Sequence, residues 1–234
     1  MRNSGNLLLA SLSEHDAAAL RPNLKPVYLE HEKVLFEARG DVTDIYFPTG
    51  AIISLVVGLS SGEIIEAAMV GKDGLAGGFA AFGGNVSVNR AIVQLAGSAL
   101  TCKVSELRSA VLQNPTLLKT LFRHEHTVYA QASQSAACMA AHTVEARLCR
   151  WLLRARDLSA SDDMFFTQEF LAEMLGVRRT SVTLHARTLQ QAGLIKYSRG
   201  HIQITDVEGL EETVCECYET VKSYYHALLG PQAV

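Results

Sequence analysis

Residues 165–206 contain basic side chains at helical spacing, the pattern in this sequence that is best suited to bind a negatively charged partner. Arg179, Thr183 and Arg187 are spaced i, i+4 and i+8, so they share one face of a predicted helix. Residues 176–201 contain five Arg or Lys and no Asp or Glu, although the whole chain has a net charge of −3. Such a face can neutralise phosphates and pair with guanine edges, which predicts DNA binding. The alternative is a fold of the same kind that only contacts proteins, with its basic residues solvated.

Two helices, a tight turn and a small hairpin are the elements that would hold these side chains. Thr167 is placed to cap the first helix, and Gly176 after it suits a left-handed turn. The second helix has an apolar face opposite its basic one, formed by Val182, Ala186 and Leu189. Residues 194–197 and 202–204 then flank a Ser-Arg-Gly turn. The stretch therefore predicts a helix-turn-helix with a wing.

The length and composition fit a soluble protein of two domains. With 234 residues and 48% hydrophobic content, the chain can bury a substantial core. We recognise neither a signal peptide nor an apolar run long enough to cross a membrane, so we expect a cytoplasmic protein with no membrane partner. The cysteines are odd in number and scattered, which favours reduced thiols over a disulfide framework. They are Cys102, Cys138, Cys149, Cys215 and Cys217.

Short β-prone runs dominate the first half of the chain, and helical patterns dominate the second. The runs are residues 27–29, 33–36, 45–47, 52–57, 64–67, 91–94 and 99–102, separated by turn residues. Strands at this spacing predict an antiparallel sandwich or jelly roll. We therefore expect an α+β fold with a β domain over residues 1–114, a long helix over 115–140 and a winged helix-turn-helix domain over 141–234. The last domain would end in one helix over 207–229.

A heptad-like stripe on the long helix predicts a homodimer. Residues 116–139 include no Gly or Pro, and the stripe residues alternate by three and four. The stripe includes Leu118, Leu121, Val128, Ala132 and Ser135. Its members become small toward the C-terminal end, which would let two helices approach closely. Glu125 interrupts the stripe, and packing of the stripe on the chain's own β domain is the alternative.

The order of these parts resembles the Crp/Fnr (cyclic-AMP-receptor-like) family of bacterial transcription regulators. The most specific matches are Thr167-Gln168-Glu169, Leu175-Gly176, Gly193-Leu194-Ile195 and the Arg199-Gly200 wing, while Tyr46-Phe47-Pro48 and Val70-Gly71-Lys72-Asp73-Gly74 match more loosely. The resemblance covers nearly the whole chain. It implies an N-terminal antiparallel β-roll like that of cyclic-nucleotide-binding domains, a dimerisation helix and a C-terminal winged helix-turn-helix. It also implies a homodimer on a two-fold-symmetric DNA site and a contact with RNA polymerase.

The family's DNA-reading positions match this sequence in part. Arg179 stands where the family commonly reads a base edge, so it is predicted to read sequence. The next position, often Glu in the family, is Thr180, and a further family Arg position is Leu184, so we expect a different operator. Arg178 stands where a capping Ser is common. The predicted DNA surface comprises Thr167, Arg178, Arg179, Thr180, Thr183, Arg187 and Arg199, with Arg187 and Arg199 as candidate phosphate contacts.

The resemblance places an effector pocket in the β-roll, but this sequence departs from the cyclic-nucleotide pattern. Gly77-Gly78 lies where the family has a Gly-Glu pair for the ribose, and Arg90-Ala91 lies roughly where it has Arg-Ser or Arg-Ala for the phosphate. Without the carboxylate, the ribose hydroxyl loses a hydrogen bond that contributes roughly 1.5–3 kcal/mol. The ligand-facing hydroxyl pair of the central helix would be Ala132 and Ser133, so one hydroxyl is absent. A cyclic nucleotide is therefore disfavoured, and the effector stays unidentified.

Other sensor and enzyme chemistries are not favoured. No Cys precedes Cys102, which argues against an iron–sulfur cluster, and no spacing favours a haem ligand. Ligands at i and i+2 point apart on a helix, so we expect solvated histidines in His124-Glu125-His126, two helical thiols in Cys215-x-Cys217, and no metal or cofactor. A cupin-like metal enzyme would share the jelly roll, but its His-x-His set is missing from residues 27–104. No catalytic residues are evident, so we expect a regulator and not an enzyme.

These observations predict a DNA-binding transcription regulator with an effector-controlled β-roll. In the expected mechanism, the DNA-binding domains reorient about residues 140–143. Only one state of the dimer then spaces its recognition helices for half-sites about one DNA turn apart. The alternative is a β-roll that serves as a ligand-free scaffold, with constitutive DNA binding.

Overall fold

Two antiparallel sheets in the first half of the chain form the predicted β-roll. The computed structural model describes residues 4–230. One sheet has the strand order β1-β7-β3 and the other β2-β6-β4-β5, with every pair antiparallel. The strands are β1 (Lys25–Leu29), β2 (Val34–Phe36), β3 (Asp44–Pro48), β4 (Ile52–Gly58), β5 (Ile64–Val70), β6 (Arg90–Leu95) and β7 (Gly97–Lys103). Each predicted β-prone run coincides with one of them, so the α+β fold with an N-terminal β-roll is confirmed.

Short helices pack around the β-roll, and the first of them is anchored to its core. They are α1 (Leu7–Ser11), α2 (Glu14–Leu20), the 3-10 helices η1 (Arg21–Asn23) and η2 (Gly78–Phe82), and α3 (Val104–Gln113). The Asn6 side chain caps α1 and also donates to the carbonyls of Pro48 and Gly74, each at 2.8 Å. Leu8 and Leu9 of α1 are buried in the β-roll core. The N-terminal apolar run is therefore part of the core.

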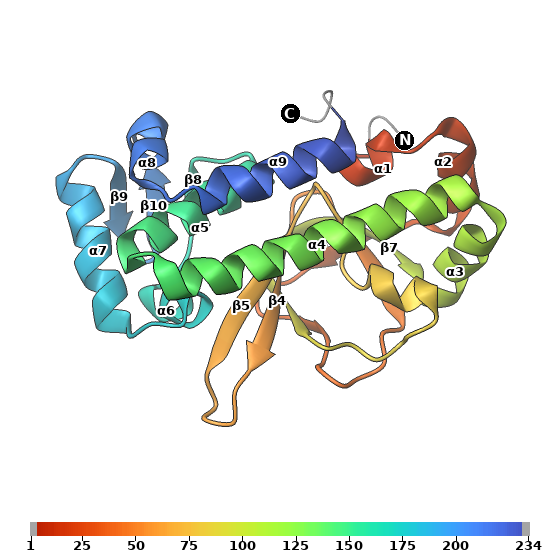
Figure 1. Ribbon diagram of the computed structural model, residues 1–234, viewed down its shortest axis with the longest axis horizontal. Coiled ribbons are helices and arrows are strands. Elements are labelled where there is room, and N and C mark those ends of the chain that lie inside the picture. Colours follow the sequence, from red (N-terminus) through yellow and green to blue (C-terminus); the bar gives the residue numbers. More distant parts are fainter. Residues whose placement is uncertain (1–3, 231–234) are drawn as a thin grey trace.

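A single long helix, α4 (Pro115–Ala141), crosses the molecule beside the β-roll (Figure 1). Pro115 stands at its start, where the missing N–H leaves no helical hydrogen bond unmade. The C-terminal helix α9 (Cys217–Leu229) runs back along it (Figure 1). Arg123 donates to the carbonyl of Ala227 at 2.5 Å, and the Gln134 amide donates to Cys217 Sγ at 3.0 Å. The predicted central helix is confirmed, and part of its surface is covered by its own chain.

The second half of the chain folds as the predicted helix-turn-helix with a wing. Its elements are α5 (Val144–Ser159), β8 (Asp163–Phe165), α6 (Gln168–Leu175), α7 (Arg179–Gln191), β9 (Ile195–Ser198), β10 (His201–Ile204) and α8 (Val207–Thr213). The wing has a third strand, because β8 pairs with β10 opposite β9. The sequence did not predict β8, since its three residues are too few to show a period of two.

The prediction of one C-terminal helix over residues 207–229 is wrong. The chain forms α8 and α9, with an extended residue, Val214, between them. The break lets α9 leave the helix-turn-helix and bury Val221, Tyr225 and Leu228 in the core of the β-roll. Burial of these side chains outweighs the helical propensity of the intervening residues. The last helix thus packs with the N-terminal core and not only with the domain predicted for residues 141–234.

The β-roll and the helix-turn-helix share buried surface. Ile52, Val56 and Met69 of β4 and β5 belong to the same buried cluster as Trp151 and Phe166 of the second half. The two halves are therefore packed as one body, and the β4–β5 hairpin reaches past α4 toward α6 (Figure 1).

Candidate DNA-reading surface and neighbouring sites

The residues that begin and end the two helices of the helix-turn-helix can be identified in the structure. Thr167 Oγ1 accepts a hydrogen bond from the N–H of Phe170 at 3.1 Å and so caps α6. Gly176 follows α6 with φ of +59°, the left-handed conformation that glycine adopts without penalty. Arg178 stands at the N-cap of α7 and makes no capping bond with its side chain. The Arg178 guanidinium is therefore left exposed at the start of the recognition helix.

The second helix, α7, presents the predicted polar face to solvent. Val182, Ala186 and Leu189 are buried against the rest of the domain. Arg179, Thr183 and Arg187 are exposed on the opposite side, as are Arg178 and Thr180 at its start. Leu184 is 61% exposed and adds an apolar side chain to the solvent-facing part of the helix. The face that could enter a DNA groove is thus free of contacts with the domain's own core.

A hollow between α6, α7 and the wing gathers three of the predicted contact residues. Thr167, Arg179 and Arg199 line it. Arg179 Nε lies 3.7 Å from Glu169 Oε2, with both side chains about two-thirds exposed, so water weakens this ion pair. Thr183 Oγ1 donates to Gln168 Oε1 at 2.7 Å and joins the two helices at the surface. Arg187 lies further along α7 and does not line the hollow.

The turn of the wing holds Arg199 in a left-handed backbone conformation that is strained for any residue but glycine. Arg199 has φ of +50° and Gly200 has φ of +86°, between β9 and β10. The Tyr197 hydroxyl donates to the carbonyl of Phe166 at 2.8 Å and fixes β9 against the start of α6. Pairing of β9 with β10 and the Tyr197 bond therefore keep Arg199 near α6 and α7.

The residues predicted for the effector pocket have separate surroundings. Gly78 packs so closely on Leu75 and Glu125 that a Cβ would lie 2.4 Å and 2.5 Å from their side chains, and Gly77 beside it packs on Val42. Ser133 is exposed on α4, so its hydroxyl does not face the β-roll. Arg90 Nε pairs with Glu37 Oε2 at 3.1 Å, and Ala91 is fully buried in the core. Of the predicted set, Gly77, Gly78 and Ala91 thus lie in packed surroundings, while Arg90 pairs within the chain and Ser133 faces outward.

A buried polar cluster that the sequence did not predict lies between β4, β5 and β6, beside α5. Ser54 Oγ lies 2.6 Å from Glu66 Oε2 and also contacts Gln94 Oε1, and all three residues are buried. Burial raises the pKa of Glu66 to about 7, although its bond to Ser54 and the charge of Arg150 act in the opposite direction. Nearby, Arg154 of α5 pairs with Asp73 at 2.7 Å. No periodicity of the sequence reveals such pairs, because their members come from separate elements.

The exposed stripe of α4 differs from the predicted seam by about one residue. Leu121 and Ser135 are buried within the chain itself, because η2, β5 and α9 cover that side of α4. Val128 and Ala132 are half-buried, and only Leu118 of the predicted set is exposed. The large hydrophobic side chains exposed on α4 are Leu118, Phe122 and Tyr129.

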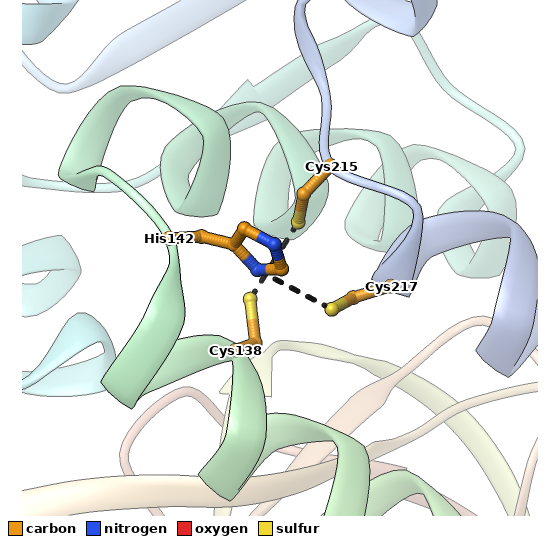
Figure 2. Close-up of side chains that lie close together, drawn as sticks. All are labelled: Cys138, His142, Cys215 and Cys217. Carbon is orange, nitrogen blue, oxygen red and sulfur yellow. Dashed lines mark hydrogen bonds between the residues drawn. The ribbon is translucent and has the colours of Figure 1, made fainter.

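Two predictions about potential metal ligands need correction. His124 is not solvated: it is fully buried and its Nε2 accepts from the N–H of Leu75 at 3.2 Å, while His126 is exposed as predicted. Cys215 and Cys217 do not lie on one helix, because Cys215 is in the link before α9. Both thiols lie beside Cys138 and His142 of the end of α4 (Figure 2). Burial raises the pKa of the Cys215 thiol to about 12.

Comparisons with known proteins identify part of this architecture. Residues 146–213 match the family model described as the Crp-like helix-turn-helix domain. No curated protein matches the sequence. In the part of the chain that the structure describes, no helix has the length and apolar character needed to cross a membrane.

Solved structures share the fold of nearly the whole chain. A Crp/Fnr-family transcriptional regulator from Eubacterium rectale has a TM-score of 0.68 at 16% identity, with coverage of 88% of this chain and 96% of that one. FixK2 from Bradyrhizobium japonicum has a TM-score of 0.67 at 14% identity, covering 82% and 98%. A CRP/FNR-family regulator from Thermus thermophilus has a TM-score of 0.66 at 22% identity, covering 81% and 97%. At these identities the likeness is one of fold.

Proposed function

We propose that this chain, which is Crp/Fnr-like in its helix-turn-helix domain and in its fold, is a sequence-specific DNA-binding transcription regulator that acts as a homodimer. The observation that supports the proposal best is the exposed face of α7, with Arg179, Thr183 and Arg187 on a Crp-like domain. A basic, solvent-facing helix beside a wing is the arrangement that reads a major groove.

The proposed roles of the side chains follow from their positions. Arg179 stands at the start of α7 with a loosely held guanidinium, so we assign it to base edges, where an Arg can pair bidentately with guanine. Thr180 and Leu184 would lie in the same groove, and the Leu184 side chain suits a thymine methyl group.

Phosphate contacts would flank this reading surface. Arg178 precedes α7 at its N-cap, Arg187 lies two turns along the helix and Arg199 lies on the wing, all exposed. Thr167, at the N-terminus of α6, would add its backbone and hydroxyl to a phosphate. These contacts would fix the register of α7 in the groove and supply the affinity that does not depend on sequence.

The dimer would form through the exposed face of α4. Leu118, Phe122 and Tyr129 follow each other at spacings of four and seven, and the exposed Ser133 and Ala136 extend the same face toward the DNA-binding domain. Two such helices would place two recognition helices on a two-fold-symmetric operator.

Control by an effector would act through the segment between α4 and α5, at residues 140–143. Because β4 and β5 share a buried cluster with α5 and α6, a change in the β-roll would reach the DNA-binding domain directly. The tight packing at Gly78 and the outward position of Ser133 do not favour a cyclic nucleotide as that effector. The competing version is a β-roll that only scaffolds the dimer. A contact with RNA polymerase belongs to the proposal through the family resemblance.

Selection of DNA from a random library tests the proposal. Purified protein at one stated salt concentration, without added ligand, should enrich a palindrome with half-sites about one helical turn apart. The Arg179→Ala variant should enrich a less defined sequence. A library that shows no enrichment with the wild type, with or without a cyclic nucleotide, would favour a winged helix that only contacts proteins.

A further inference from the structure

We propose that Cys138, His142, Cys215 and Cys217 together bind a zinc ion. Their three sulfurs and one imidazole nitrogen all lie within 4.8 Å of one another. The three cysteines are buried and the histidine is half-buried. Figure 2 shows the four side chains converging from the end of α4 on one side and from the start of α9 on the other.

The positions of the ligands follow from the local backbone. Cys138 and His142 are four residues apart at the C-terminal end of α4, where the N–H of His142 still bonds to the carbonyl of Cys138 at 3.0 Å. That spacing puts both side chains on one face of the helix. Cys215 and Cys217 flank Glu216 where the chain passes from α8 to α9. A link outside a helix allows residues at i and i+2 to face the same point.

The distances between ligand atoms suit a tetrahedral ion. Cys138 Sγ lies 3.6 Å from Cys215 Sγ, and Cys217 Sγ lies 3.5 Å from His142 Nδ1. Zinc bonds of about 2.3 Å to sulfur and about 2.0–2.1 Å to nitrogen separate tetrahedral ligands by roughly 3.8 Å and 3.5 Å, respectively. An ion could therefore enter with only small shifts of the side chains.

The surroundings of the ligands also suit a bound cation. His142 Nε2 lies 3.2 Å from Glu216 Oε1, so a carboxylate would hold the imidazole with Nδ1 toward the metal. The Gln134 amide donates to Cys217 Sγ at 3.0 Å. Arg147 and Arg150 interact electrostatically with Cys138, which would balance the net negative charge of three thiolates around one divalent ion.

The ligand set indicates zinc in a structural role. Three thiolates with one imidazole fill a tetrahedron, so no coordination position is left for water or substrate. Such soft ligands disfavour magnesium and calcium. A disulfide between Cys138 and Cys215 is the competing chemistry. It would use two of the four residues and require the sulfurs to approach from 3.6 Å to about 2.05 Å.

The position of the site suggests what the ion would do. The chain enters the helix-turn-helix domain after His142 and leaves it at Cys215. One ion would thus fix both ends of this domain to the last turn of α4, and its ligand His142 lies within residues 140–143. The metal site does not depend on the proposed function, whereas its effect on DNA binding does.

Metal analysis of the full chain tests the site. After purification under reducing, oxygen-free conditions and reconstitution with zinc, elemental analysis should find about one zinc ion per chain. Cobalt(II) added to the metal-free chain should give the intense visible bands of a tetrahedral site and a thiolate-to-cobalt charge-transfer band. Absence of stoichiometric binding by the wild-type chain to either ion would overturn the proposal.

Variants locate the ion and distinguish the competing chemistry. Cys138→Ser and Cys217→Ser should each lose the charge-transfer intensity or bind cobalt at least tenfold more weakly, while Cys149→Ala, a buried thiol outside the cluster, should match the wild type. Wild-type cobalt binding remains decisive should a variant not fold. Peptide mapping without reduction should find Cys138, Cys215 and Cys217 free of disulfides, and a Cys138–Cys215 disulfide in place of metal would overturn the proposal.

Discussion

Arg179 and Arg187 lie on one exposed face of α7 but should contribute differently to DNA binding. Arg179→Ala should reduce discrimination at one base position of the half-site by about 1–3 kcal/mol, because base contacts specify sequence. Arg187→Ala should weaken binding to all sequences alike and lower the slope of log affinity against log salt by about 1, since it would contact a phosphate. Titrations of matched and mismatched duplexes at several salt concentrations measure both effects.

The matched control for these two substitutions is Arg21→Ala. Arg21 is also an exposed arginine, but it lies in η1 of the β-roll, where it pairs with Glu14. Its removal changes the net charge equally and should leave the salt slope and the sequence preference unchanged. Equal losses in all three variants would mean that only overall charge matters and that α7 does not read the groove.

Glu66 predicts how the stability of the fold depends on pH. Burial in the folded state raises the pKa of Glu66 from 4.5 to about 7, so Glu66 binds a proton more tightly in the folded state than in the unfolded state. The free energy of unfolding should therefore fall as the pH rises from 4.5 to 7, by on the order of 3 kcal/mol, and should not fall further from this cause above pH 7. Glu66→Gln should remove most of this dependence.

Urea unfolding of the wild type and of Glu66→Gln at pH 5 and pH 8 measures the difference. The variant should match the wild type near pH 5 and be more stable at pH 8, because the amide keeps a hydrogen bond to Ser54 without a buried charge. The idea fails if both proteins lose the same stability between the two pH values.

Between elements, the Arg154–Asp73 ion pair joins α5 to the turn that follows β5. Both side chains are about nine-tenths buried and their atoms are 2.7 Å apart. Asp73→Asn would remove the carboxylate that bonds directly to the buried guanidinium, so the free energy of unfolding should fall by about 3–5 kcal/mol. Adding Arg154→Met should recover much of the loss. Denaturant unfolding of the single and double variants would test this, and an additive loss would mean that the pair is not coupled.

Elements with a strong period were predictable, and contacts between distant elements were not. The apolar faces of α6 and α7 and the short β runs each follow from neighbouring residues. The break at Val214 and the cluster of four residues around Cys138 depend on where α9 packs, and no local sequence pattern encodes that position. The spacing of Cys138 and His142 at the end of α4 was visible in the sequence. Two ligands alone do not form a tetrahedral site, however, and only the fold brings Cys215 and Cys217 beside them.

The apolar stripe that is left exposed on α4 differs from the predicted one for a related reason. Leu121 and Ser135 have the spacing of a dimer stripe, but a helix of this length offers several such stripes. The chain's own β5, η2 and α9 cover one side of α4 and leave another exposed. Only the tertiary packing decides which stripe faces a partner.

Across the whole molecule, α4 would connect dimerisation, sensing and DNA binding. Its exposed side has Phe122 and Tyr129, its opposite side packs on β5, and its end meets the proposed zinc site at Cys138. A change in the pairing of two such helices would therefore move both DNA-binding domains together. Affinity for a palindrome should depend on this pairing as strongly as on the residues that touch DNA.

Tyr129→Glu tests this dependence. Tyr129 is 69% exposed in one chain, and two glutamates facing each other across a paired α4 would repel and lose apolar contact. Sedimentation should show monomers, and affinity for a palindrome should fall about 100-fold or more while binding to a single half-site stays weak and unchanged. Tyr28→Glu is the matched control, because Tyr28 is 66% exposed on β1 of the β-roll. A Tyr129→Glu protein that remains dimeric would place the contact elsewhere, and the coupling from α4 to the operator would then have to be sought on another surface.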